Sequence, residues 1–172
     1  ARDLFYAFNR SDKYDIKVID VRWGECPRDA LNPNNEKDKQ ILDCILPMPP
    51  KVDRQPDIYV DIRIPQEFET FGKFNIGITA GVETTAVSNK WIEGCNKMDL
   101  VIVPSEHSKD GFVNTIYDKI QQTPDGQQQK VGEHKLEKPI EVLFEGVDED
   151  VFKPLSVDKI DDVFLEKINK II

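Results

Sequence analysis

Three short runs of mostly aliphatic residues, 74–79, 100–103 and 140–144, each pass directly into a loop with polar side chains or glycine. Such runs, separated by segments of helical periodicity, are typical of an α/β fold with a largely parallel sheet. In a parallel sheet, the loops that follow the strands collect along one edge, where ligands bind. This pattern therefore constrains both the fold and the position of a functional site.

Two further strands are predicted upstream, over residues 16–23 and 57–64, with a candidate helix over residues 36–45 between them. The polar, turn-rich stretch 123–133 has no periodicity, so we expect an exposed loop before the last strand. The resulting fold class is α/β, with a Rossmann-like parallel sheet flanked by helices. A chain of 172 residues is most simply read as one domain.

Two helices are predicted between the strands that lead into the loops. Ser88 is placed to cap a helix with Trp91 on its apolar face, and Ser105 to cap a longer helix that extends through Ile120. At the chain ends, the apolar spacing in residues 1–8 predicts a helix that starts upstream of the chain. A helical stripe in residues 160–172 predicts that more protein follows.

Composition excludes several classes of function. The net charge of −9 disfavours a nucleic-acid partner, because the average surface repels phosphate. No run reaches the roughly 18 to 20 apolar residues that a membrane span needs. Cys26, Cys44 and Cys95 form no C-x-x-C pair, so free thiols in the cytoplasm are expected. His107 and His134 lie at no metal-ligand spacing, and no metal site is predicted.

The residues after the strands define the site hypothesis. Segments 81–85, 104–109 and 145–148 each follow a predicted strand. Helix N-termini at this edge also offer unpaired N–H groups and a partial positive charge. We therefore expect these three segments to converge on one ligand.

Four pieces in order carry a family resemblance: residues 79–85 with Trp91, then 96–105, 139–148 and 151–154. They resemble the N-terminal domain of retaining glycosyltransferases with the two-domain GT-B architecture. The similarity is to the large nucleotide-sugar-dependent group (glycosyltransferase family 4-like) that includes sucrose synthases and mannosyltransferases. The resemblance covers roughly residues 74–154.

The resemblance implies a division of labour between two domains. Residues 1–154 would form the Rossmann-like, acceptor-side domain, and residues 155–172 a helix that leads toward an absent donor-binding domain. The full-length enzyme would transfer a sugar from a nucleotide-sugar to an acceptor hydroxyl on a carbohydrate, lipid or protein, with retention. The nucleotide-sugar is a co-substrate, and no other cofactor is implied. This part alone would be inactive.

Glu83 is the candidate catalytic residue, because a carboxylate at a strand end can accept a hydrogen bond from a sugar hydroxyl or withdraw its proton. The alternative is that Glu83 caps or salt-bridges the next helix. Six residues are candidates for binding the acceptor: Thr84, Thr85, Trp91, Ser105, Glu106 and Lys109. Each also has a structural alternative, namely capping for the hydroxyl groups, core packing for the indole and solvent exposure for the charged side chains.

The donor-side candidates are Glu145, Gly146, Val147 and Asp148. Glycine there would permit close backbone approach to the donor. Glu145 stands where the family more often has Asn, and its carboxylate would repel a diphosphate. A non-catalytic sugar- or nucleotide-binding module therefore remains an alternative, as does a sugar epimerase of the same architecture.

Overall fold

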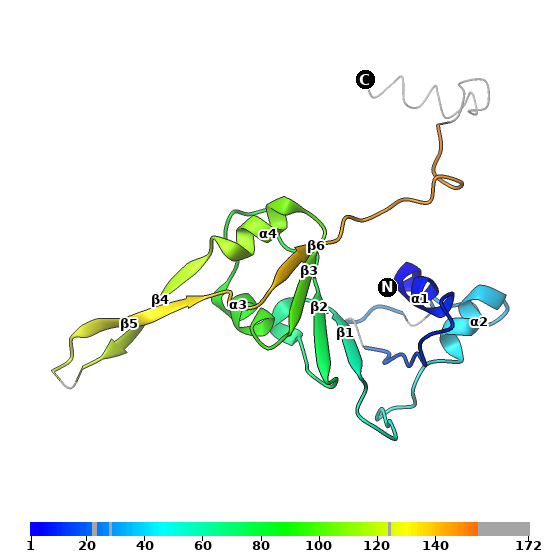
Figure 1. The fold of residues 1–172 in the computed structure, drawn as a ribbon, viewed down its shortest axis with the longest axis horizontal. Helices are drawn as coiled ribbons and strands as arrows, with labels where there is room; N and C mark the ends of the chain where they lie inside the picture. Colours follow the sequence, from blue (N-terminus) through cyan, green and yellow to red (C-terminus); the bar gives the residue numbers. More distant parts are fainter. Residues whose placement is uncertain (22–23, 28, 124, 155–172) are drawn as a thin grey trace.

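The computed structural model describes residues 1–21, 24–27, 29–123 and 125–154. Its centre is a four-stranded parallel sheet in the order β1-β2-β3-β6 (Figure 1). The strands are β1 (Ile58–Ile62), β2 (Phe74–Ile78), β3 (Leu100–Val103) and β6 (Ile140–Val142). The predicted mixed α/β fold with a parallel sheet is confirmed, since all three strand pairings are parallel.

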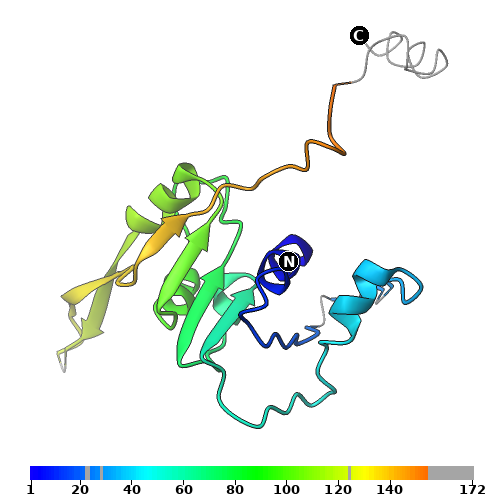
Figure 2. The ribbon, with the colours of Figure 1, turned by 45° about the vertical axis from the view of Figure 1, so that its right-hand side comes forward.

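One face of the sheet is covered by α3 (Asn89–Cys95), α4 (Glu106–Val113) and the short 3₁₀ helix η1 (Pro65–Glu67) (Figure 2). The core that they bury against the sheet consists of Phe68, Val87, Ile92, Cys95, Met98, Val101, Val103, Phe112 and Ile140. Packing is tightest between α3 and η1, where a Cβ on Gly94 would lie 1.8 Å from the Pro65 carbonyl oxygen. Glycine is therefore required at this helix crossing.

The other face of the sheet is apolar and partly uncovered. Ile58, Ile62 and Phe74 are 52%, 41% and 43% exposed. Strand register places Ile76 beside Leu100 and Ile78 beside Ile102 on the same face. The apolar strands predicted from the sequence are thus present, but only one face is packed against the helices described above.

A β-hairpin replaces the second half of the predicted long helix. The helix capped by Ser105 ends at Val113 and is followed by β4 (Ile116–Gln122) and β5 (Gln128–Lys135), which pair antiparallel and project from the body of the molecule (Figure 1). The expected helix through Ile120 is wrong. The stretch 123–133 is mostly exposed, as expected, but residues 128–133 belong to β5 rather than to a loop. Cross-strand pairing with residues 128–135 outweighs a local helical pattern here.

The N-terminal region contains α1 (Arg2–Asn9) and α2 (Glu36–Leu42), as the sequence predicts. The strand predicted over 16–23 is wrong within the described residues, because only Val18 forms an isolated bridge, with Ile45. Residues 22 and 23 lie outside the described part. The partner segment soon reaches prolines, which lack the N–H that a ladder requires.

The chain leaves the sheet after β6 as an exposed tail, residues 143–154. The tail includes Phe144, which is 81% exposed. The last strand is therefore shorter than the predicted 140–144. The helix predicted within 155–172 lies outside the described residues. Among the helices that the structure describes, none combines the length and hydrophobicity needed to cross a bilayer.

Candidate active site at the strand-end rim

The loops after β2 and β3 meet at the carboxyl edge of the sheet. Ile78 pairs with Ile102, and the Thr79 N–H donates to the Ile102 carbonyl oxygen at 3.1 Å. The end of β6 reaches the same edge, because the Leu143 N–H donates to the Val103 carbonyl oxygen at 2.9 Å. We call residues 80–85 and 104–109 the rim. Two of the three segments expected to converge are therefore neighbours.

A glycine holds the first rim segment against α4. Gly81 has φ of +80°, which disfavours any residue with a side chain. A Cβ at this position would lie 2.7 Å from Ser108 Oγ. That hydroxyl donates to the Ala80 carbonyl oxygen at 3.1 Å, and the Ser108 N–H donates to Ser105 Oγ at 3.1 Å. The β2 loop is thereby fixed to the first turn of α4.

Glu83 lies at the outer end of this loop. Its backbone carbonyl oxygen is 3.3 Å from His107 Nε2, in the first turn of α4. Its side chain is exposed and forms no ion pair or hydrogen bond with the residues that the structure describes. Glu83 does not cap the following helix, since α3 begins only at Asn89 and is capped by Ser88. The carboxylate is therefore free to meet a ligand.

The acceptor candidates Thr84, Thr85 and Trp91 either stabilise the fold or lie on its surface. Thr84 Oγ1 donates to the Ala86 carbonyl oxygen at 2.8 Å and so stabilises the loop itself. Thr85 is exposed. Trp91 is half-buried and stacks on Phe112, with ring centroids 6.1 Å apart and an interplanar angle of 18°. The indole thus packs against the core.

The candidates on α4 divide between capping and surface charge. Ser105 is the N-cap, because its hydroxyl accepts from the Ser108 N–H. Glu106 is exposed in the first turn. Lys109 Nζ is 3.8 Å from Glu141 Oε2, a weak, partly exposed ion pair that ties α4 to β6. Lys109 therefore sits at the rim with one acidic neighbour.

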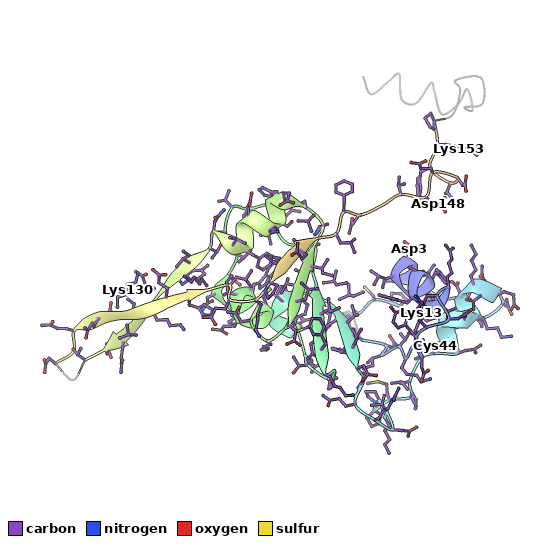
Figure 3. The ribbon with its side chains drawn as sticks, in the orientation of Figure 1. Asp3, Lys13, Cys44, Lys130, Asp148 and Lys153 are labelled. Carbon is purple, nitrogen blue, oxygen red and sulfur yellow. The ribbon has the colours of Figure 1, made fainter. Side chains whose placement is uncertain are left out.

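The donor-side candidates do not join the rim. Glu145, Gly146, Val147 and Asp148 are all exposed, and a Cβ on Gly146 would meet nothing within 4 Å. Asp148 lies out on the tail, well away from the sheet, where its side chain accepts from the Asp150 N–H (Figure 3). Beyond Leu143, none of the strands that the structure describes pairs with the tail. The expected convergence of all three segments is therefore only partial.

A charged cluster at the end of β1 was not anticipated. Asp61 is 3% exposed and accepts two hydrogen bonds from the Arg63 guanidinium, at 2.7 and 2.6 Å, and one from the Glu69 N–H at 2.9 Å. The hydrogen bond to Asp61 raises the pKa of Arg63. Burial, and next the Asp61 charge, raise the pKa of nearby Tyr59 to about 12. The cluster is internally satisfied, so its role is to fix the segment after β1.

His107 is the rim residue that the sequence did not single out. From its spacing in the sequence, His107 was a candidate only for binding a metal, and no metal site was predicted there. Its Nε2 lies 3.3 Å from the Glu83 carbonyl oxygen because the first turn of α4 packs beside the loop after β2, a relationship that requires the packed fold. Within the described ranges, no group of three or more His, Cys, Asp and Glu side chains is arranged to hold a metal ion.

Comparison of the chain with protein-family models, with curated proteins and with solved structures finds no match.

Proposed function

We propose that this chain is the N-terminal, acceptor-side domain of a retaining glycosyltransferase with the two-domain GT-B architecture. In this proposal residues 1–154 form the acceptor-side domain, and residues 155–172 lead toward a domain that binds the nucleotide-sugar. The support is the ordered set of motifs in the sequence, together with a parallel sheet whose β2 and β3 loops share one edge.

The observation that carries the proposal is the free carboxylate of Glu83 on a fixed loop. Its backbone contacts His107, and the loop is clamped through Gly81 and Ser108. A carboxylate without a protein partner can accept a hydrogen bond from an acceptor hydroxyl and orient its oxygen toward the sugar. Because the loop is already fixed, the carboxylate can keep this orientation without a loss of loop entropy when the acceptor binds.

The start of α4 supplies the opposite charge at the same edge. The first turn of α4 carries the positive end of the helix dipole, and Lys109 adds a positive charge to the rim. These groups would favour a polar or anionic acceptor and offset negative charge that develops on the leaving phosphate. The donor domain would supply most contacts to the nucleotide.

The exposed tail has a role in the same proposal. Phe144, Val147 and Phe152 are 81%, 62% and 70% exposed, which leaves apolar surface in contact with water. In the two-domain enzyme this tail would pack between the domains and bring the Gly146 backbone to the donor. The Glu145 carboxylate would then point away from the diphosphate.

The reaction class is tested with the full-length protein and a panel of nucleotide-sugars. We expect one donor to be consumed with release of its nucleotide, and NMR of the product to show the anomeric configuration of the donor retained. Inversion of that configuration, or donor consumption only as epimerisation without transfer, would contradict the proposal.

A non-catalytic sugar- or nucleotide-binding module is the second candidate. The observation that favours it is the carboxylate of Glu145 at a position where the resembled family more often has Asn. The two candidates differ in one result: a binding module would bind a nucleotide-sugar without turning it over.

The cellular compartment is part of the proposal as well. Cys26, Cys44 and Cys95 are all free in the structure. Free thiols fit a reducing compartment, and we propose the cytoplasm, where nucleotide-sugars would also have to be present.

A further inference from the structure

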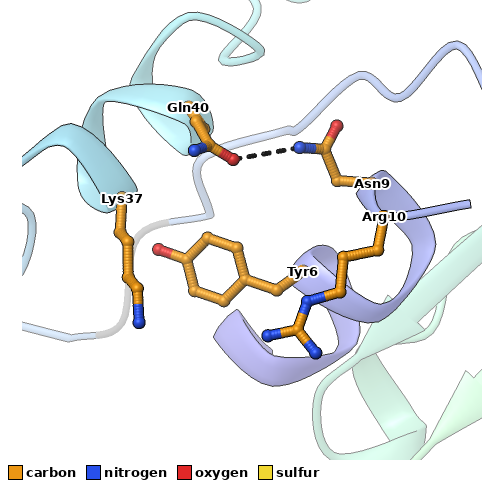
Figure 4. Close-up of a pocket in the computed structure, with 5 residues that line it drawn as sticks. All are labelled: Tyr6, Asn9, Arg10, Lys37 and Gln40. Atoms are coloured by element: carbon orange, nitrogen blue, oxygen red, sulfur yellow. Dashed lines mark hydrogen bonds between the residues drawn. The ribbon is translucent and has the colours of Figure 1, made fainter. Parts of the chain in front are cut away.

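A cavity of about 220 Å³ lies between α1 and α2 (Figure 4). It is lined by Tyr6, Asn9, Arg10, Lys37 and Gln40. None of these residues belongs to the rim, and the proposed transferase chemistry uses none of them. A ligand in this cavity would therefore bind separately from the proposed acceptor.

The charge of the lining is one-sided. Among the lining residues that the structure describes, Arg10 and Lys37 are the charged ones, and neither side chain forms an ion pair or hydrogen bond with any other described residue. Figure 4 shows their charged ends extending toward the same side of the opening, on either side of the Tyr6 ring. In a chain of net charge −9, two unpaired cations around one cavity create a local site for an anion.

The rest of the lining is suited to hydroxyl groups. Asn9 Nδ2 donates to Gln40 Oε1 at 3.1 Å, which fixes the orientation of both amides. Asn9 Oδ1, Gln40 Nε2 and the Tyr6 hydroxyl then have no protein partner in the described part of the chain. They offer an acceptor, a donor and a group that can act as either.

We propose that this cavity binds a small hydroxylated molecule that carries one phosphate group. A phosphate monoester carries a charge of about −1.5 to −2 at pH 7 and so balances two cations, whereas a carboxylate balances one. The size agrees, because pockets for drug-sized ligands begin near 300 Å³ and this cavity is smaller. The amides and the Tyr6 hydroxyl bind the hydroxylated part. The site is independent of the glycosyltransferase assignment.

The test is a titration of the purified protein, followed by the amide NMR signals of α1 and α2 at constant ionic strength. The probes are inorganic phosphate, a hexose monophosphate, acetate and sodium chloride. We expect saturable shifts around Arg10 and Lys37 with the hexose monophosphate, weaker ones with phosphate, and none with acetate or chloride.

Variants separate a specific site from general charge attraction. Lys37→Gln and Arg10→Gln should each weaken binding of the hexose phosphate about tenfold, the loss of one charge-assisted hydrogen bond. Lys39→Gln on the same helix removes the same charge but lines no part of the cavity, and should leave affinity unchanged. Gln40→Glu should abolish binding. Equal weakening by Lys39→Gln, or no saturable shift with either phosphate probe, would overturn the proposal.

Discussion

Gly81 lies so close to Ser108 that a Cβ on the glycine would be 2.7 Å from the serine hydroxyl oxygen. The two residues are 27 positions apart in the chain, yet their contact sets the position of the loop that carries Glu83. Because the backbone of Gly81 also has φ of +80°, conformation and space both require glycine at this point.

Gly81→Ala should lower the free energy of unfolding by about 2 to 4 kcal/mol, because it adds a strained φ to an overpacked contact. Gly126→Ala is the matched control, since Gly126 has φ of +78° but open space around it. Denaturant unfolding should show a clearly larger loss for Gly81→Ala. Equal losses would mean that the Ser108 contact is unimportant.

Gly94→Ala should be more damaging still, because its Cβ would lie 1.8 Å from the Pro65 carbonyl oxygen. Backbone on both sides must move, so we expect a loss of at least about 3 kcal/mol or failure to fold. Gly146→Ala, where a Cβ meets nothing, should leave the thermal midpoint unchanged. A stable Gly94→Ala protein would contradict the packing of α3 against η1.

Thr115 follows α4 and links this helix to the segment before α3. Its hydroxyl donates to the Gly111 carbonyl oxygen at 2.6 Å and accepts from the Val87 N–H at 3.1 Å. Thr115→Val keeps the shape but leaves a buried N–H unpaired, which costs about 1 to 3 kcal/mol. Thr70→Val at an exposed position is the control and should change the unfolding midpoint little.

The pH dependence of stability should include a contribution from Asp99. Hydrogen bonds from the Asn75 backbone and side chain lower the pKa of Asp99 from its ordinary value of 3.8. A lowered pKa means that this contribution is present above the unfolded value and is lost as pH falls through the folded one. Asp99→Asn should therefore flatten the loss of stability below about pH 4. An unchanged slope in acid unfolding curves would exclude this contribution.

The sequence predicts the parts of the fold that depend on local pattern. The aliphatic runs at 74–78 and 100–103 are strands, and Ser88 and Ser105 cap the helices that follow. The hairpin could not be recognised in the same way. Ile116, Tyr117 and Ile120 fit a helical face, and only pairing with residues ten or more positions away makes them a strand.

Only part of the candidate site could be predicted from the sequence, namely which residues follow the strands. Glu83 and Ser105 were expected at the sheet edge because parallel strand ends lie side by side. The contact between His107 and the Glu83 carbonyl oxygen depends on how α4 packs, which no local pattern encodes. The position of Gly146 relative to the rim depends on what the tail packs against. The sequence of this exposed tail contains no local pattern that predicts that packing.

The central claim is that the free carboxylate of Glu83 acts on the acceptor. Its most direct test is sugar transfer by the full-length protein with Glu83→Gln, which keeps the shape of the side chain and removes its charge. Glu93→Gln, at an exposed position of α3, is the control. We expect Glu83→Gln to lower kcat by about 10²- to 10⁴-fold, with unfolding and nucleotide-sugar affinity unchanged. Full turnover by Glu83→Gln, or an equal loss in Glu93→Gln, would contradict the account.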